Sequence, residues 1–300
     1  MIRLSAIVPA TNDPPTLERC VAAIRAADEP PEELIVVDGA PGPGPAAARN
    51  EGASRATGDV LVFVDADVVV HPEGIGRIRR AFDSEPELAA LFGSYDDDPF
   101  DPGIVSAFRN LLHHHVHTCA AGPASTFWAG LGAIRREAFD EAGGFDAARY
   151  PQPSVEDIDL GLRVSAAGGL IRLDPSVRGT HLKAWTLLDM LEADFARRGV
   201  PWMELLLERH GGSTALNLGW RHRLSALATL AAALSVATRR PRPAAFSLAA
   251  LLALYAYFYV LLLRRRGMVT ALAGVGLHTL HHLSAIAAVP TAIARRAHRR

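Results

Sequence analysis

Two aspartates at the end of an apolar run are the residues whose type and spacing point most directly to chemistry. Residues 60–64 read Val-Leu-Val-Phe-Val, and Asp65 and Asp67 follow at positions i and i+2. A short apolar run rich in β-branched residues is typical of a buried strand in a parallel sheet. Open α/β sheets bind ligands just beyond the carboxyl ends of such strands. Because close carboxylates repel each other unless a cation lies between them, the pair predicts a Mg²⁺ or Mn²⁺ site that holds a phosphate or diphosphate.

A purely structural role is the alternative for such acids. In many α/β proteins the acid that ends a strand caps the next helix, and Pro72 shortly after Asp67 fits that interpretation. The same alternative applies to Glu156 and Asp157, which begin a predicted helix over residues 155–167. Acidic residues in a first helical turn are ordinary because they interact favourably with the helix dipole. Spacing alone leaves both interpretations open.

The charge distribution divides the chain into two parts. Residues 1–210 contain 19 Lys and Arg and 32 Asp and Glu, a net charge of −13, whereas residues 211–300 contain 12 Arg and no acid, a net charge of +12. An acid-free, strongly apolar segment flanked by arginines is typical of membrane association and not of nucleic-acid binding. We therefore predict a catalytic domain over residues 1–210, a membrane-associated region over residues 211–300, and no nucleic-acid partner.

Three apolar segments of this region are candidates for membrane contact. Residues 224–238 are short, since a helix of that length covers roughly 22 Å of a hydrocarbon core of ~30 Å. Residues 244–263 and 268–293 are long enough for transmembrane helices. Either all three segments cross, or 224–238 lies at the interface while the other two cross. The second arrangement keeps most arginines cytosolic and is favoured. It predicts a multi-pass protein of the cell (inner) membrane with a cytoplasmic catalytic domain.

The first ninety residues show strands and helices in alternation. Apolar runs predict strands at 4–9, 34–38 and 60–65, and amphipathic or helix-forming stretches separate them. The predicted helices cover 16–27, 46–56 and 72–82. Strand, helix and strand at this spacing are typical of βαβ units and predict an α/β fold with a mainly parallel sheet.

Short motifs occur in a fixed order along residues 3–183. They are Ile7-Val-Pro-Ala-Thr-Asn12, Val36-Val-Asp38, Ala48-Arg-Asn50-Glu-Gly52, Gly58 to Asp67, Gly130-Leu-Gly-Ala-Ile-Arg-Arg136, Gly143-Gly-Phe-Asp146, Glu156-Asp157-Ile-Asp-Leu-Gly-Leu-Arg163 and His181. In this order the set resembles family 2 glycosyltransferases. The resemblance implies the GT-A nucleotide-diphospho-sugar transferase fold, a mainly parallel sheet flanked by helices, followed here by the C-terminal hydrophobic membrane helices.

The resemblance also assigns roles on the donor side. It implies that the nucleotide-diphosphate sugar is bound by Pro9, Thr11, Asp38, Arg49, Asp65 and Asp67. The first three of these line the nucleotide base and ribose, and Arg49 approaches the nucleotide. Asp65 and Asp67 match the Asp-x-Asp motif that binds Mg²⁺ or Mn²⁺ together with the diphosphate. His181 matches a position that completes the metal site in some relatives.

On the acceptor side, the resemblance implies that Asp157 is the general base of an inverting transfer. Glu156 is included as a catalytic residue because its negative charge lies beside that of Asp157. The Gln-x-x-Arg-Trp motif of processive synthases is absent, so one sugar is expected to be added. The membrane region favours a lipid or lipid-linked acceptor. That acceptor is either a hydroxyl, which needs a base, or a polyprenyl phosphate, which is already an anionic nucleophile.

Two other function classes remain as alternatives. A non-catalytic, membrane-anchored scaffold that binds nucleotide sugars would keep the same fold without turnover. A haloacid-dehalogenase-type phosphatase would use Asp65-Ala-Asp-Val-Val69 as its aspartate motif, and it would also need a catalytic lysine. Lys183 is the only lysine in the chain. A metal-assisted glycosyltransferase is the favoured interpretation.

Overall fold

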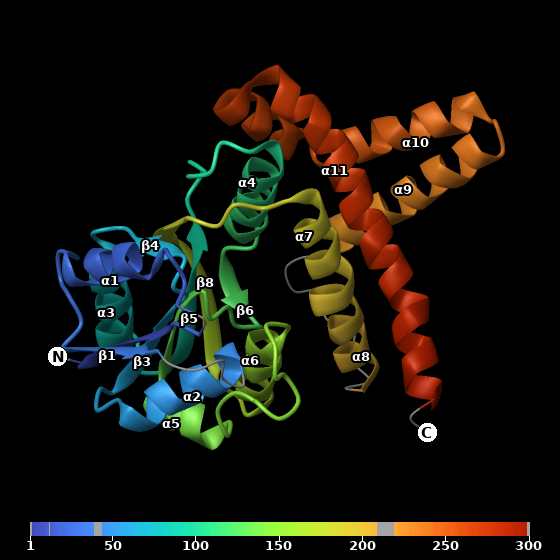
Figure 1. Ribbon diagram of the computed structural model, residues 1–300. Helices are drawn as coiled ribbons and strands as arrows, with labels where there is room; N and C mark the ends of the chain where they lie inside the picture. Colours follow the sequence, from blue (N-terminus) through green and yellow to red (C-terminus); the bar gives the residue numbers. More distant parts are fainter. Residues whose placement is uncertain (1, 12, 39–43, 209–218, 299–300) are drawn as a thin grey trace. The chain divides into compact units, whose positions relative to one another are not determined.

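The computed structural model describes the chain except residues 1, 12, 39–43, 209–218 and 299–300 (Figure 1). Its internal contacts divide it into two compact units. The first unit comprises Met1–Phe100 and Val116–Lys183, and the second comprises Asp101–His115 and Ala184–Arg300. The predicted domain boundary at residue 210 lies outside the described residues.

A mixed sheet forms the centre of the first unit. Its described strands are β1 (Leu4–Pro9), β2 (Glu33–Val37), β3 (Val60–Val64), β4 (Val68–Val70), β5 (Leu88–Tyr95), β6 (Gly122–Ala124), β7 (Leu131–Arg135) and β8 (Leu170–His181). The strand order is β2-β1-β3-β7-β5-β8-β4, and β6 pairs with β8. β1 runs parallel to β2 and β3, and β5 runs parallel to β8. The other pairs are antiparallel: β7 pairs with β3 and with β5, and β4 and β6 each pair with β8. The predicted α/β fold is confirmed, with a mixed sheet in place of a mainly parallel one.

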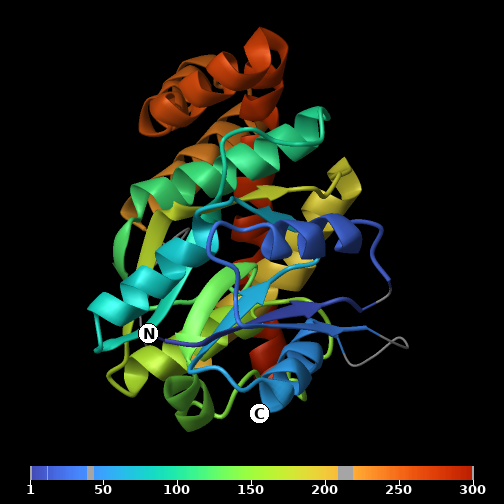
Figure 2. The same cartoon turned by 90° about the vertical axis from the view of Figure 1, so that its left-hand side faces the viewer.

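Helices cover both faces of this sheet. They are α1 (Leu17–Arg25), α2 (Pro45–Arg55), α3 (Gly74–Ser84), α5 (Arg136–Glu141) and α6 (Glu156–Ala166). Successive residues of a strand point to opposite faces. Val62 packs in a core with Cys20 of α1 and Ile75 of α3. The next residue, Phe63, contacts Phe139 of α5 at a ring-centroid separation of 5.8 Å. Figures 1 and 2 show α1 and α2 on opposite sides of the sheet.

The register of the parallel strands brings the candidate site residues to one edge. β1 is paired in parallel with β2 on one side and with β3 on the other, so the carboxyl ends of all three strands lie together. Thr11 lies just beyond the end of β1, Asp38 follows β2, and Asp65 follows β3. This is the edge at which α/β sheets bind ligands.

The second unit is helical in its described residues. It contains the first part of α4 (Ile104–Cys119), then α7 (Leu187–Glu192), the π-helix η1 (Ala193–Gly199), α8 (Val200–Glu208), α9 (Trp220–Ala237), α10 (Pro241–Leu254) and α11 (Ala256–His298). The apolar segment predicted at 224–238 forms most of α9. Its location at a membrane interface stays a prediction.

Among the described helices, one is long and apolar enough to cross a membrane. This is α11, whose best 18-residue window has a mean hydropathy of 1.3. The segment predicted at 244–263 is not one helix, because α10 ends at Leu254 and Tyr255 has φ −119° and ψ 24°. The segment predicted at 268–293 lies in α11 beyond Gly267, which interrupts that helix with φ 80°. The structure therefore supports one candidate span where the sequence predicts two.

A buried acid joins three helices of the second unit. Asp194 of η1 pairs with Arg109 of α4, and its Oδ2 lies 2.8 Å from Nδ1 of His281 in α11. The side chain of Asp194 is 4% exposed. Burial alone would raise the pKa of Asp194, but the contacts with His281 and Arg109 hold it below its usual range. The carboxylate is therefore charged and fully engaged inside the helical unit.

Asp194→Asn is expected to destabilise the second unit, because the buried Arg109 would lose the carboxylate that it faces. Breaking a buried pair on one side costs about 3–5 kcal/mol. The midpoint of thermal unfolding in detergent should therefore fall by about 10 °C. Glu192→Gln is the matched control, since its pair with Arg197 is exposed and such pairs contribute little. Equal midpoints for Asp194→Asn and the wild type would contradict this role.

Candidate active site

Asp65 and Asp67 lie in the short turn between β3 and β4, where the main chain is held from both sides. The N–H of Asp65 donates to the carbonyl of Gly130 at 3.0 Å, and the carbonyl of Asp67 accepts from the N–H of Leu182 at 2.8 Å. The two side chains are partly open, with exposed fractions of 32% and 29%. The turn therefore presents two carboxylates at the ligand-binding edge of the sheet on a fixed backbone.

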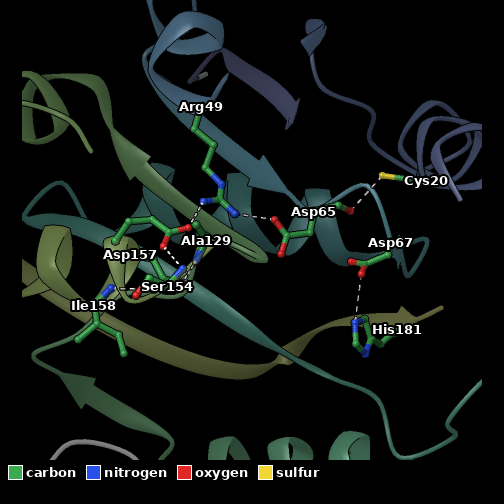
Figure 3. A network of polar contacts seen from close by, with 10 residues as sticks. Cys20, Arg49, Asp65, Asp67, Ala129, Ser154, Asp157, Ile158 and His181 are labelled. Atoms are coloured by element: carbon green, nitrogen blue, oxygen red, sulfur yellow. Dashed lines mark hydrogen bonds and ion pairs between the residues drawn. The ribbon is translucent and has the colours of Figure 1, made fainter. Parts of the chain in front are cut away.

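Arg49 connects the first of these carboxylates with the start of α6 (Figure 3). One terminal nitrogen lies 2.7 Å from Oδ1 of Asp65, and the other lies 3.0 Å from Oε1 of Glu156. Arg49 is 4% exposed. Burial raises the pKa of Asp65, Arg49 opposes that effect, and the neighbouring Asp67 adds to it. The predicted approach of Arg49 to a nucleotide stays a prediction, because in the structure its guanidinium already binds two carboxylates.

Asp67 faces His181 at the end of β8. Nε2 of His181 lies 3.4 Å from Oδ2 of Asp67. Burial would raise the pKa of Asp67, but the hydrogen bond and charge of His181 lower it, and Lys183 adds to the lowering. The ring of His181 is nearly buried and stacks on Tyr95, with 4.2 Å between ring centroids and 9° between planes. His181 is therefore held in place on one side while it contacts Asp67 on the other.

The predicted metal ligands Asp65, Asp67 and His181 can be tested against the donor chemistry of the site. Carboxylates suit Mg²⁺ and Mn²⁺. In the described part of the chain, no three His, Cys, Asp or Glu side chains are grouped closely enough to hold an ion alone. Mg²⁺ in phosphate-transfer sites is commonly held by one or two carboxylates together with substrate phosphates, which needs no such group. The two aspartates fit a metal shared with a diphosphate.

Asp157 lies in the first turn of α6, and main-chain amides fix its carboxylate. Oδ2 accepts from the N–H of Ala129 at 3.2 Å, and Oδ1 accepts from the N–H of Ile158 at 2.8 Å. Close packing of α6 on the segment before Ala129 makes this possible, because a Cβ on Gly161 would lie 2.2 Å from the backbone nitrogen of Phe127. A larger residue at Gly161 would push the helix and its carboxylate away from the segment.

The loop that contains Ala129 connects the two groups of acids. The carbonyl of Gly130 accepts from the N–H of Asp65, and the preceding N–H, that of Ala129, donates to Asp157. Glu156 has both carboxylate oxygens engaged, by Arg49 and by the N–H of Ser154 at 2.8 Å. The structure thus brings together the predicted acids of β3 and α6 through one arginine and one loop.

The predicted base and ribose residues lie at the neighbouring strand ends. Pro9 is buried in β1, and the next residue, Ala10, donates its N–H to the carbonyl of Val37 at 2.9 Å. Thr11 is half-buried and Asp38 is exposed. The loop that follows Asp38 lies outside the described residues. Their roles in nucleotide binding stay predictions.

Two aromatic residues at the site have no counterpart in the sequence predictions. Tyr95 stacks on His181, and its ring also meets Trp128 edge to face at a centroid separation of 4.9 Å. The sequence around each of these two residues does contain a local pattern. Tyr95 stands at the end of an apolar run just before an acidic loop, and Trp128 precedes the Gly130 motif. Neither pattern says that the two rings meet, because the contact depends on strands far apart in the chain.

Comparison with known proteins agrees with this fold. The family model for glycosyl transferase family 2 matches residues 40–143, which include Arg49, Asp65 and Asp67. The chain resembles the mannosyltransferase PcManGT from Pyrobaculum calidifontis, solved in complex with GDP-Man and Mn²⁺, with a TM-score of 0.57 and 16% identity over 97% of this chain and 87% of that one. A more remote likeness is to GalNAc-T7 with UDP, GalNAc and Mn²⁺, at a TM-score of 0.45 and 16% identity over 69% of this chain and 48% of that one.

The mixed sheet, the flanking helices and the likeness to PcManGT show the GT-A fold. Within the chain, residues 40–143 match the family model for glycosyl transferase family 2. The match to the glycosyl transferase family 2 model favours a glycosyltransferase over the haloacid-dehalogenase-type phosphatase considered from the sequence.

Proposed function

We propose that the chain transfers a single sugar, with inversion, from a nucleotide-diphosphate sugar to a lipid or lipid-linked acceptor. The observation that carries the proposal is the pair of partly open carboxylates, Asp65 and Asp67, on a fixed turn at the ligand-binding edge of the sheet. The structural likeness to a mannosyltransferase that was solved with GDP-Man and Mn²⁺ supports the same donor chemistry here.

Asp65 and Asp67 would hold Mg²⁺ or Mn²⁺ together with the donor diphosphate. When bound, the ion neutralises the negative charge that builds up on the phosphate oxygens as the sugar leaves. His181 supports this site through Asp67, because its contact keeps the Asp67 carboxylate ionised and oriented. Nε2 of His181 and Oδ2 of Asp67 are 3.4 Å apart, so His181 could also hold the ion beside Asp67.

Arg49 and Glu156 give the site its electrostatic frame. Arg49 neutralises part of the charge on Asp65, which lowers the repulsion between the two aspartates. Glu156 anchors the far side of the guanidinium and is itself buried. Glu156 acts on Asp65 through Arg49, and Asp157 beside it is proposed as the carboxylate that meets the acceptor.

Asp157 is the proposed general base. An acceptor hydroxyl is a poor nucleophile until a nearby carboxylate takes its proton, and such a base contributes about 10²–10⁴-fold to the rate. The amides of Ala129 and Ile158 hold the Asp157 carboxylate in one orientation. Attack on the anomeric carbon from the side opposite the diphosphate inverts its configuration.

The second unit is proposed to attach the enzyme to the inner face of the cell membrane. Its described helices expose many large apolar side chains, among them Trp220, Leu227, Val236, Phe246, Val269 and Leu272. Residues 209–300 contain no acid, and several arginines flank the apolar stretches. Exposed apolar area with flanking cations suits a lipid interface, with α11 as the candidate span. An active site kept beside lipid favours a lipid acceptor.

A screen of sugar nucleotides tests the donor assignment. In the presence of Mn²⁺, the cognate donor should raise the thermal midpoint of the detergent-solubilised protein, because a ligand at 100 times its Kd stabilises by about 2.7 kcal/mol. The shift should disappear with EDTA and in Asp67→Asn. Stabilisation by no UDP-, GDP- or dTDP-linked sugar, with metal present, would contradict the proposal. Stabilisation without turnover on any lipid acceptor would instead support the non-catalytic scaffold.

A further inference from the structure

A buried carboxylate with several hydrogen bonds lies at the end of β5. Asp96 is 6% exposed. Its Oδ2 accepts from Nε2 of His71 at 3.0 Å and from the hydroxyl of Thr180, and its Oδ1 accepts from the N–H of Asp98 at 3.2 Å. Burial of a carboxylate is costly unless such donors surround it. We call Asp96, Thr180 and His71 the Asp96 network.

The Asp96 network joins three neighbouring strands at one point. β8 lies between β5 and β4 in the sheet. Asp96 follows β5, Thr180 lies in β8, and His71 follows β4. Main-chain bonds accompany the side chains, since the N–H of His71 donates to Arg178 at 2.9 Å and that of Asp96 donates to Gly179 at 3.0 Å. The end of β8 is therefore held on both of its edges.

The Asp96 network and the stacked rings of Tyr95 and His181 lie on opposite faces of the same strands. Thr180 and His181 are consecutive in β8, and Tyr95 and Asp96 are consecutive at the end of β5. Consecutive side chains in a strand point to opposite faces. Tyr95 stacks on His181 on one face, and Thr180 contacts Asp96 on the other. The two pairs are therefore back to back.

We propose that the Asp96 network consists of positioning residues that hold His181 against Asp67 from the opposite face of the sheet. This inference rests on the proposed function, because Asp67 is taken there as a ligand of the metal and donor. The end of β8 meets Asp67 twice, through the side chain of His181 and through the N–H of Leu182. A shift of that strand end would move both contacts, and misplacement of about 1 Å can cost about 10²-fold in rate.

Thr180→Val tests the network because it removes one donor and keeps the shape and strand preference of the side chain. We expect kcat to fall about tenfold while KM for the donor stays within about twofold, because the misplaced contact acts on charge that develops in the transition state. Thr180→Ser keeps a hydroxyl and should restore at least half of wild-type kcat. Ser176→Ala is the control in the same strand, since it removes a hydroxyl that donates to Asp174 at 2.6 Å. It should leave kcat unchanged.

A second readout separates positioning from a loss of folded protein. Protein with ¹⁵N-labelled histidine reports the ring of His181 directly, and His181→Gln identifies its signals. Thr180→Val should shift the His181 signals, whereas Ser176→Ala should not. The inference would be overturned if the folded Thr180→Val protein had the kcat of the wild type, or if its His181 signals were not shifted. An inactive wild type with every donor would count against the proposed function alone, and the NMR comparison would still decide whether the network positions His181.

Discussion

Asp67→Asn is expected to lower kcat for sugar transfer by about 10³-fold, because one charge of the two-carboxylate pair is lost. The substitution keeps the size of the side chain, and an amide can still meet His181. What disappears is the negative charge that would share the metal with the diphosphate. Asp65 cannot compensate, because Arg49 already neutralises part of its charge at 2.7 Å. Growing charge on the departing diphosphate is then left without stabilisation.

The control for this variant is Asp59→Asn, at the opposite end of the same strand. Asp59 accepts the N–H of Arg3 at 2.9 Å, so the substitution also removes a charged acceptor beside β3, but far from the donor edge. Its kcat should stay within about twofold of wild type. Turnover is measured with the donor found in the stabilisation screen, over a range of Mn²⁺ concentrations. Two results would contradict the metal role of Asp67. One is turnover by the wild type that persists in EDTA, and the other is an Asp67→Asn variant that keeps a tenth of the wild-type kcat.

Strand positions near the amino terminus can be predicted because their signal is local. A mostly apolar run at residues 4–9, ended by turn-forming residues, predicts β1 with the bounds that it has. The run at residues 60–65 predicts β3 within one residue. Parallel register then follows from the βαβ order, which places the acids after β2 and β3 at one edge.

The antiparallel strands cannot be predicted in this way. β4 has only three residues, and Val68 is a strand residue because it pairs with His181, more than a hundred positions later. β7 enters the sheet between β3 and β5, although it follows both along the chain. Pairing partners at such separations leave no periodic trace in a single sequence, so the mixed character of the sheet becomes visible only in three dimensions.

The candidate site likewise has some residues that the sequence predicts and some contacts that it does not. Residue type and position at a strand end point to Asp65 and Asp67, and the family resemblance points to Asp157. The link between them does not follow from the sequence, because Arg49 reaches Glu156 across 107 positions and the contact requires α6 to pack on the loop before β7. In the helical region, hydropathy marks apolar stretches but carries no signal for the break at Tyr255 between α10 and α11.

Asp157→Asn is expected to distinguish the two chemical classes of acceptor. A hydroxyl must lose its proton as it attacks, and removal of the base should lower kcat by about 10³-fold. A polyprenyl phosphate already carries the negative charge of a nucleophile, so its transfer should fall by no more than about tenfold. The amide keeps an oxygen that can accept from Ala129 or Ile158, which preserves the turn at the start of α6.

Both acceptors can be compared with a radiolabelled donor and the same detergent-solubilised enzyme. Asp140→Asn, at the exposed end of α5, is a control that removes a carboxylate of the first unit without touching this contact. A thousandfold loss with a lipid hydroxyl would identify Asp157 as the base and the acceptor as an alcohol. A small loss with polyprenyl phosphate, on an enzyme that does not use alcohols, would assign the residue to acceptor binding. Full activity of Asp157→Asn on a hydroxyl would remove Asp157 from the mechanism, because no proton would then need the carboxylate that Ala129 and Ile158 hold in place.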